Sequence, residues 1–190
     1  MSNLEVRKAT YEDLVQVPDH LVAEIIDGVL YAQPRPAVRH SNASGALMIL
    51  VGGPFHLGSG GPGGWRILDE PELHLREDIV VPDIAGWNLE HTGDIPDAAF
   101  VDVAPDWVCE VLSPRTQKLD RTRKMGIYAR EGVQHVWLVD PADRVLEIYR
   151  LDEGLWAPAA VFHDNAVVRA EPFDAIQIKL AALWWDNIKS

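Results

Sequence analysis

The sequence predicts an α/β fold, in which a mixed central β-sheet is flanked by helices and carries additional β-hairpins. Three observations lead to this prediction: a short helix is followed mostly by strand-like runs, one prominent helix comes next, and further strand-like runs follow it. The chain has 190 residues, and one domain usually takes about 100 to 200 residues. We therefore expect residues 1–190 to form a single domain with one core.

The first elements have clear local signals. Thr10 can cap a short helix over 10–17, and acidic residues fall in its first turn. Two apolar runs, 21–26 and 29–31, flank Asp27-Gly28, and Asp-Gly accepts the positive φ angles of a tight hairpin turn. The hairpin places Glu24 in the middle of its first strand.

A second helix is expected over 39–51, although Gly45 weakens it. Residues 52–64 then hold seven glycines in 13 positions. This stretch lacks the Gly-Lys-Ser/Thr ending that a phosphate-binding loop needs, so we interpret it as a mobile connection. Strands follow over 65–68, 71–75 and 79–85, with a turn at Glu77-Asp78. Because Pro82 has no N–H to donate, the sheet should open beside Asp83.

The second half of the chain alternates in the same way. A polar loop is expected over 91–105, a strand over 106–112, and a helix over 116–131 that stops at Gly132. Runs 136–139 and 145–149 form a hairpin around 140–143. A strand near 156–162 and a short segment ending in Trp184-Trp185 complete the domain.

Composition limits the function. Net charge is −12, which argues against nucleic acid binding over the whole surface, because phosphates are bound by Lys and Arg. Six of the 17 cations nevertheless fall between positions 115 and 130. We call them the basic strip: Arg115, Lys118, Arg121, Arg123, Lys124 and Arg130. The alternative is an ordinary solvated helix face.

Location and thiol chemistry follow from what the sequence lacks. Its apolar runs are much shorter than the roughly 20 residues that cross a bilayer, so we expect a soluble protein without a membrane partner. The first residues do not resemble a signal peptide, which favours the cytoplasm. Cys109 is the single cysteine and lies in an apolar run, so it is interpreted as a buried thiol and not as a nucleophile.

Two acids are the most informative residues. Asp83 follows one apolar run and Glu110 ends another, which suggests carboxylates on neighbouring buried strands. Unpaired buried charges are costly, so an Arg, a Lys or a divalent cation should lie between them. Mg²⁺ or Mn²⁺ would accept both carboxylates and a main-chain carbonyl such as that of Val111. Strand alternation puts Glu110 and Leu112 on one face and Val111 on the other.

A set of motifs resembles a known family. These are Val81-Pro82-Asp83, Glu110-Val111-Leu112-Ser113-Pro114, Asp120…Lys124…Tyr128 and Val136-Trp137-Leu138-Val139-Asp140-Pro141, together with the Glu24–Gly28 hairpin. From about Tyr11 to Leu151 the chain is similar to the restriction-endonuclease-like family common in cyanobacteria. That family, a domain of unknown function, is placed in the PD-(D/E)XK nuclease superfamily.

The resemblance implies a restriction-endonuclease-like fold and a Mg²⁺- or Mn²⁺-dependent endonuclease that hydrolyses phosphodiester bonds in nucleic acid, with DNA as the expected substrate. Asp83, Glu110 and Lys124 would be catalytic, and Glu24 would be a further metal-binding acid beside Asp83, Glu110 and Val111. The Lys usual two residues after the second acid is replaced by Leu112, so Lys124 would supply that charge.

His40 matches a frequent family histidine of unassigned role. Arg115, Lys118, Arg121 and Arg123 would contact the nucleic acid.

Alternatives remain open for these residues. Asp120 and Lys124 have the i,i+4 spacing of a surface ion pair, Glu24 could point outward, His40 could be a surface residue, and an Arg could hold Asp83 and Glu110. The fold could also serve as a catalytically silent binding or assembly module, for example a homodimer formed through exposed Trp residues. Paired carboxylates also occur in glycosidases, but the basic strip argues against that chemistry. No H-E-x-x-H spacing supports a zinc hydrolase.

Overall fold

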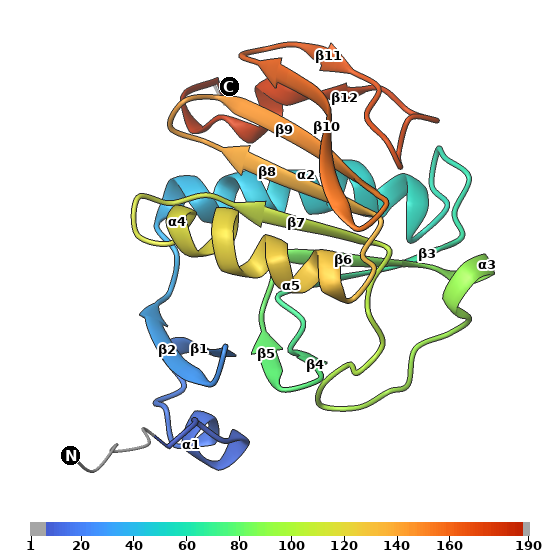
Figure 1. Ribbon diagram of the computed structural model, residues 1–190. Helices are drawn as coiled ribbons and strands as arrows, with labels where there is room; N and C mark the ends of the chain where they lie inside the picture. Colours follow the sequence, from blue (N-terminus) through green and yellow to red (C-terminus); the bar gives the residue numbers. More distant parts are fainter. Residues whose placement is uncertain (1–6, 188–190) are drawn as a thin grey trace.

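A computed structural model describes residues 7–187. Its centre is a six-stranded sheet with strand order β10-β9-β8-β7-β6-β3, in which β7 and β8 are parallel and the other neighbours antiparallel. Helix α2 (Val38–Phe55) covers one face, and the helical segment from α4 (Gln117–Leu119) to α5 (Met125–Arg130) covers the other (Figure 1). The predicted mixed α/β architecture is confirmed. The six strands are β3 (Trp65–Asp69), β6 (Ile84–Asn88), β7 (Trp107–Val111), β8 (His135–Asp140), β9 (Val145–Asp152) and β10 (Leu155–His163).

A second, four-stranded sheet lies beside the first, with the antiparallel order β2-β1-β5-β4. It consists of β1 (Leu21–Ile26), β2 (Val29–Pro34), β4 (Leu73–Leu75) and β5 (Asp78–Val80). Asp27 and Gly28 have φ angles of 54° and 77°, so the predicted hairpin is confirmed. The short helix α1 (Tyr11–Val15) buries Leu14 against Ile25 and Ile79.

The expected strand 79–85 is wrong as a single element. It divides into β5, which belongs to the smaller sheet, and β6, which belongs to the larger one. Residues 81–83 form the link between the two sheets, and Pro82 stops the hydrogen-bond ladder there because it has no N–H. The sheet therefore does open beside Asp83. The preceding turn lies one residue earlier than expected, at Arg76-Glu77.

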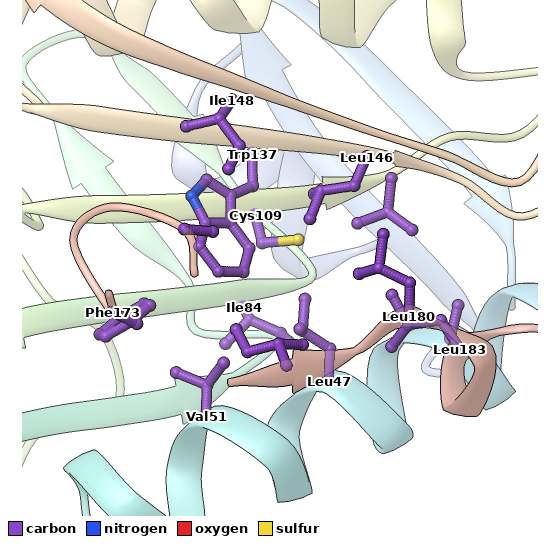
Figure 2. Close-up of a cluster of buried hydrophobic side chains, with 14 of the residues drawn as sticks. Leu47, Val51, Ile84, Cys109, Trp137, Leu146, Ile148, Phe173, Leu180 and Leu183 are labelled. Atoms are coloured by element: carbon purple, nitrogen blue, oxygen red, sulfur yellow. The ribbon is translucent and has the colours of Figure 1, made fainter. Parts of the chain in front are cut away.

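Helix α2 (Val38–Phe55) is longer than expected and includes the first residues of the glycine-rich stretch. Leu47, Val51 and Phe55 are buried at its contact with the large sheet. Figure 2 shows Leu47 and Val51 directed toward Ile84. Tertiary burial of an apolar face outweighs the low helix propensity of Gly52 and Gly53, so the mobile connection cannot begin at residue 52.

The expected helix 116–131 is present but not uniform. It consists of α4 (Gln117–Leu119), a π-helical turn (Asp120–Lys124) and α5 (Met125–Arg130). Gly132 ends it with a φ angle of 78°. The expected loop 91–105 is wrong at its start, because the short helix α3 (Leu89–Thr92) occupies that position, with the Asn88 side chain accepting from the Glu90 N–H.

The C-terminal segment completes the core on the α2 side. It contains β11 (Val167–Val168), β12 (Ile178–Lys179) and two 3-10 turns, Leu180–Leu183 and Trp185–Asn187. Phe173 is fully buried and packs edge-on against Trp65, Trp107 and Trp137. Within residues 7–187, none of the helices combines the length and the apolar character that crossing a bilayer requires.

Candidate active site

Three acids meet where the two sheets are linked. Glu24 lies in the middle of β1, Asp83 in the 81–83 link, and Glu110 on β7. The Glu24 Oε1 atom accepts a hydrogen bond of 2.9 Å from the Val81 N–H, and Asp83 Oδ2 accepts one of 2.6 Å from the Val111 N–H. The link is thus fixed to a strand of each sheet by the same carboxylates that form the site.

Lys124 occupies the space between two of these acids. Its Nζ atom lies 2.8 Å from Glu110 Oε1 and 3.0 Å from Glu24 Oε1. The side chain is only 3% exposed. It also donates to the carbonyl of Val81 at 3.3 Å, and Asp120 Oδ1 is 3.9 Å away.

The burial of these residues and the contacts of Lys124 show that three alternatives from the sequence analysis are wrong. Asp120 and Lys124 are buried and form no surface pair. Glu24 is 5% exposed and does not point outward. The cation that contacts Glu110 is a Lys and not an Arg. Lys124 partly compensates the buried charges of Glu24 and Glu110, because it contacts both carboxylates directly.

Tyr128 is a site residue to which the sequence analysis gave no role. Its hydroxyl donates a 2.5 Å hydrogen bond to Glu110 Oε1, the same oxygen that Lys124 contacts. Asp120, Lys124 and Tyr128 are separated by four residues each, and all three are buried. That spacing was the available signal, because residues four apart lie on one side of a helix.

His40 comes from the first turn of α2 and contacts Asp83, with Nε2 at 3.2 Å from Oδ1. Its side chain is 12% exposed, so the surface alternative is wrong. Burial lowers the pKa of the imidazole, but the hydrogen bond and the negative charge of Asp83 outweigh burial and raise it above its ordinary value. Asp83 thus has a main-chain donor on one oxygen and an imidazole on the other.

Burial and mutual charge shift the pKa values of the acids and the lysine in the site. Burial raises the pKa of Glu110 well above its ordinary value, against the attraction of Lys124. Burial likewise raises the pKa of Asp120 to about 6. Burial lowers the pKa of Lys124, but the charges of Glu110 and Glu24 outweigh it, so the net direction is upward and the ammonium stays protonated at neutral pH.

A cavity of about 340 Å³ opens onto this cluster. Asp83, Glu110 and Lys124 all line it, so the structure brings the three expected catalytic residues to one place. Residues 34–37, at and after the end of β2, and residues 113–116, between β7 and α4, also line it. Pro34, Pro36 and Pro114 lie in these two segments.

The donors suit a hard divalent cation, which prefers carboxylate and carbonyl oxygens. Asp83, Glu110 and Val111 line the cavity together. Glu24 does so as well, but its Oε1 is shared by Lys124 and the Val81 N–H. Within the described residues no three His, Cys, Asp or Glu side chains are grouped as a metal cluster. An ion would therefore depend on two carboxylates, main-chain oxygen and water.

The basic strip is largely neutralised. Arg121 pairs with Glu147, Arg123 with Asp27 at 2.8 Å, and Arg130 with Asp78 at 2.8 Å. In the part of the chain that the structure describes, Arg115 and Lys118 are exposed and form no ion pair. Arg115 also lines the cavity. Within the described residues the basic strip therefore forms no continuous free basic surface, and its two cations without an ion pair lie just before and at the start of the helix.

Comparisons with known proteins agree with this architecture. The family model Uma2, described as "Putative restriction endonuclease", matches residues 9–182. The match extends well past Leu151, where the resemblance described above ends. Among solved structures, a "putative nuclease belonging to DUF820" from Anabaena variabilis ATCC 29413 superposes with a TM-score of 0.75 at 21% sequence identity. The alignment covers 95% of this chain and 99% of that one, and at this identity it shows a shared fold. No curated protein matches the chain.

Proposed function

Because the chain belongs to the Uma2 family of restriction-endonuclease-like proteins, we propose that it is a Mg²⁺- or Mn²⁺-dependent endonuclease that hydrolyses phosphodiester bonds in nucleic acid, with DNA as the expected substrate. One observation carries the proposal. Lys124 Nζ contacts Glu110 at 2.8 Å in a cavity that also exposes Asp83. Two carboxylates and a fixed cation in one cavity suit a reaction whose transition state gathers negative charge on phosphate oxygens.

Asp83, Glu110 and the carbonyl of Val111 would hold the metal ion, with Glu24 as a further acid. When bound, such an ion lowers the pKa of a water molecule and neutralises charge on the phosphate. His40 and Tyr128 are positioning residues, because each contacts a metal-binding carboxylate and fixes its orientation.

Lys124 acts as a cation and not as a base. Its raised pKa keeps the ammonium protonated at neutral pH, so it has no free electron pair to accept a proton from water. A protonated Nζ can instead stabilise charge that develops on the phosphate or orient the attacking water. Its contacts with Glu24 and Glu110 fix its position before substrate arrives.

Substrate contacts would begin at the free cations. Arg115 and Lys118 are available in the free protein, whereas Arg121 and Arg123 would contact nucleic acid only after leaving Glu147 and Asp27. The net charge of −12 makes the remaining surface repel phosphate. We therefore expect slow cleavage and weak binding.

The test is cleavage of supercoiled and linear DNA and of RNA by purified protein with Mn²⁺ and with EDTA. Glu110→Gln should abolish cutting, and Lys124→Ala should slow it by a factor of ~10² to 10³, as for loss of one preorganised electrostatic group. The control Glu153→Gln changes an exposed acid in the β9–β10 turn and should cut like the wild type. Thermal unfolding of each variant separates loss of activity from loss of fold.

The assembly module is the rival that this experiment addresses. Its basis was exposed Trp residues, yet only Trp185 among the seven Trp is largely exposed, at 51%. If no nucleic acid is bound or cut, even at low salt and high protein concentration, the endonuclease proposal is wrong. The hypothesis of a binding or assembly module then becomes the better one.

A further inference from the structure

The acids and the cation line the cavity, and their side chains are largely buried. The side chains of Glu24, Glu110 and Lys124 are 7%, 3% and 3% exposed, and that of Asp83 is 14% exposed. A phosphodiester must therefore enter the cavity before it can reach them. This requirement distinguishes between substrates that share the same phosphate chemistry.

The space available is small. A volume of about 340 Å³ is at the lower end of the roughly 300–1,000 Å³ typical of sites for small molecules. It is suited to one nucleotide. In an intact duplex each nucleotide is stacked and paired with its neighbours, so none can enter such a cavity alone without first being unpaired. Pro34, Pro36 and Pro114 lie in the segments that line the cavity, and their fixed φ angles limit how far those segments can move apart.

An unsatisfied polar group in the lining points to the same class of substrate. Gln33 lines the cavity, and its side-chain oxygen is buried without a hydrogen-bond partner in the described structure. A phosphodiester at neutral pH has only acceptors, so it cannot satisfy this oxygen. The edge of a base carries N–H donors, and the donors of the Watson–Crick edge are free only when the base is unpaired.

Charge also favours a single strand. Duplex DNA carries one charge per about 1.7 Å of axis, twice the density of one strand. The chain has a net charge of −12, and among the described cations that line the cavity only Arg115 has no acid partner. Lys118, three residues further along the chain, is exposed and also forms no ion pair within the described residues, but it does not line the cavity. Arg35, which also lines the cavity, is held by Glu70 at 3.1 Å. So few free cations compensate the negative charge of a single strand more fully than the doubled charge density of a duplex.

We propose that the cavity accepts an unpaired nucleotide strand in preference to intact duplex, with a base beside Gln33 and its phosphate beside Asp83 and Glu110. Single strands, flaps and frayed ends all present such a nucleotide. The inference rests on the proposed nuclease function and specifies the substrate class of the same site.

Binding without cleavage provides the test. One fluorescein-labelled oligodeoxynucleotide is titrated with wild-type protein as a single strand, as a blunt duplex, and as a duplex with an unpaired extension, in EDTA and again in Ca²⁺. We expect the single strand and the extended duplex to bind at least ~10-fold more tightly than the blunt duplex. Two or three phosphate contacts predict a salt slope of about −1.4 to −2.1 for the single strand.

Two variants separate base contact from charge. Gln33→Leu should weaken single-strand binding several-fold with an unchanged salt slope, whereas Arg115→Gln should reduce the slope by about 0.7, the contribution of one phosphate. The control Arg150→Gln removes an exposed cation of β9 that does not line the cavity, and should bind like the wild type.

Blunt duplex bound as tightly as the single strand would overturn this inference and leave the nuclease proposal intact. An unchanged affinity of Gln33→Leu for the single strand would also overturn it. Absence of binding to all three substrates would overturn the inference and the proposed function together.

Discussion

At the scale of the residue, the site is an acid cluster with too few cations. Glu24, Glu110 and Asp120 are all buried around the ammonium of Lys124, which contacts the first two within 3.0 Å and Asp120 at 3.9 Å. One positive charge cannot fully compensate three negative ones. The pKa of Asp120 is raised to about 6, chiefly by burial, with a smaller contribution from the charges of Glu24 and Asp83.

Asp120→Asn tests this imbalance. A carboxyl whose pKa rises from 3.8 to about 6 on folding binds more protons in the folded state, so stability falls as pH rises from about 4 to about 6. Asn cannot ionise, so the variant should exceed the wild type in stability at pH 8, by on the order of 3 kcal/mol, and lose this advantage at pH 4. Chemical unfolding at both pH values measures the difference.

The exposed Asp143→Asn serves as the control, and its effect should be small at both pH values. A stability difference for Asp120→Asn that does not change between pH 4 and pH 8 would show that Asp120 is ionised in the usual range.

Asp83 is a proposed metal ligand and also accepts a backbone hydrogen bond from the Val111 N–H. Asp83→Ala removes the acceptor of the Val111 N–H and should cost about 1–3 kcal/mol, the penalty for a buried unsatisfied donor. Asp83→Asn retains an acceptor oxygen and should cost less. Both variants lose the negative charge, so both should lack the rise in melting temperature that we expect Mn²⁺ to give to the wild type. Thermal unfolding with EDTA and with Mn²⁺ separates the two effects, and an equal Mn²⁺ response in wild type and Asp83→Asn would place the ion elsewhere.

At the scale of the element, the π-helical turn Asp120–Lys124 sets which side chains enter the site. The Met125 N–H bonds to the carbonyl of Asp120, five residues back, so the turn holds one residue more than an α-helix would. Each residue advances an α-helix by about 100°. A residue in a π-helical turn advances the helix by less than this, so Lys124, inside the turn, has a different direction from the one that a regular α-helix would give it. π-helical turns of this kind often occur at functional sites.

Deletion of Thr122 tests the role of this turn. Thr122 is exposed, and its hydroxyl donates to the carbonyl of Lys118 at 2.6 Å. Removing the residue should restore α-helical spacing within the turn, move the Lys124 ammonium away from Glu24 and Glu110, and abolish any nuclease activity and any Mn²⁺ response. Thr122→Ala keeps the number of residues and should stay within about 0.5 kcal/mol of wild-type stability. Full nuclease activity in the deletion variant would refute the conclusion that the π-helical turn positions the site residues.

At the scale of the whole molecule, the C-terminal segment forms part of the core and is not an appendage. Val168, Ala170, Phe173, Ile178 and Leu180 are buried in the same cluster as α2 and the large sheet. Figure 2 shows Phe173 and Leu180 beside Trp137 and Leu47 in that cluster. The family model accordingly extends to residue 182.

Phe173→Ala measures the contribution of this segment. The ring is fully buried among Phe55, Trp65, Trp107 and Trp137. Its removal should cost about 3–5 kcal/mol and lower the melting temperature by roughly 10 °C. Val167→Ala, at a 55% exposed position of the same segment, should have little effect. Equal small effects of both substitutions would show that the segment contributes little to stability.

The sequence by itself determined the local features. Alternation along the strand put Glu110 on the face of Val108, opposite Val111, and the two faces appear as separate clusters in the structure. Asp27-Gly28 specified its hairpin, and Pro82 marked the break beside Asp83. These features depend on residues within a few positions of each other, so periodicity and turn chemistry are sufficient to predict them.

Only the tertiary structure decided how those pieces meet. From the residue pattern Lys124 fitted a surface pair with Asp120, and only the family resemblance implied a catalytic cation. Its contact with Glu24 on β1 joins residues 100 positions apart. The pairing of Arg123 with Asp27 and of His40 with Asp83 likewise joins distant segments. The division of residues 79–85 between two sheets depended on which strands were available to pair with each half. Such contacts arise when helices and strands pack and bury charge together, and no local spacing encodes them.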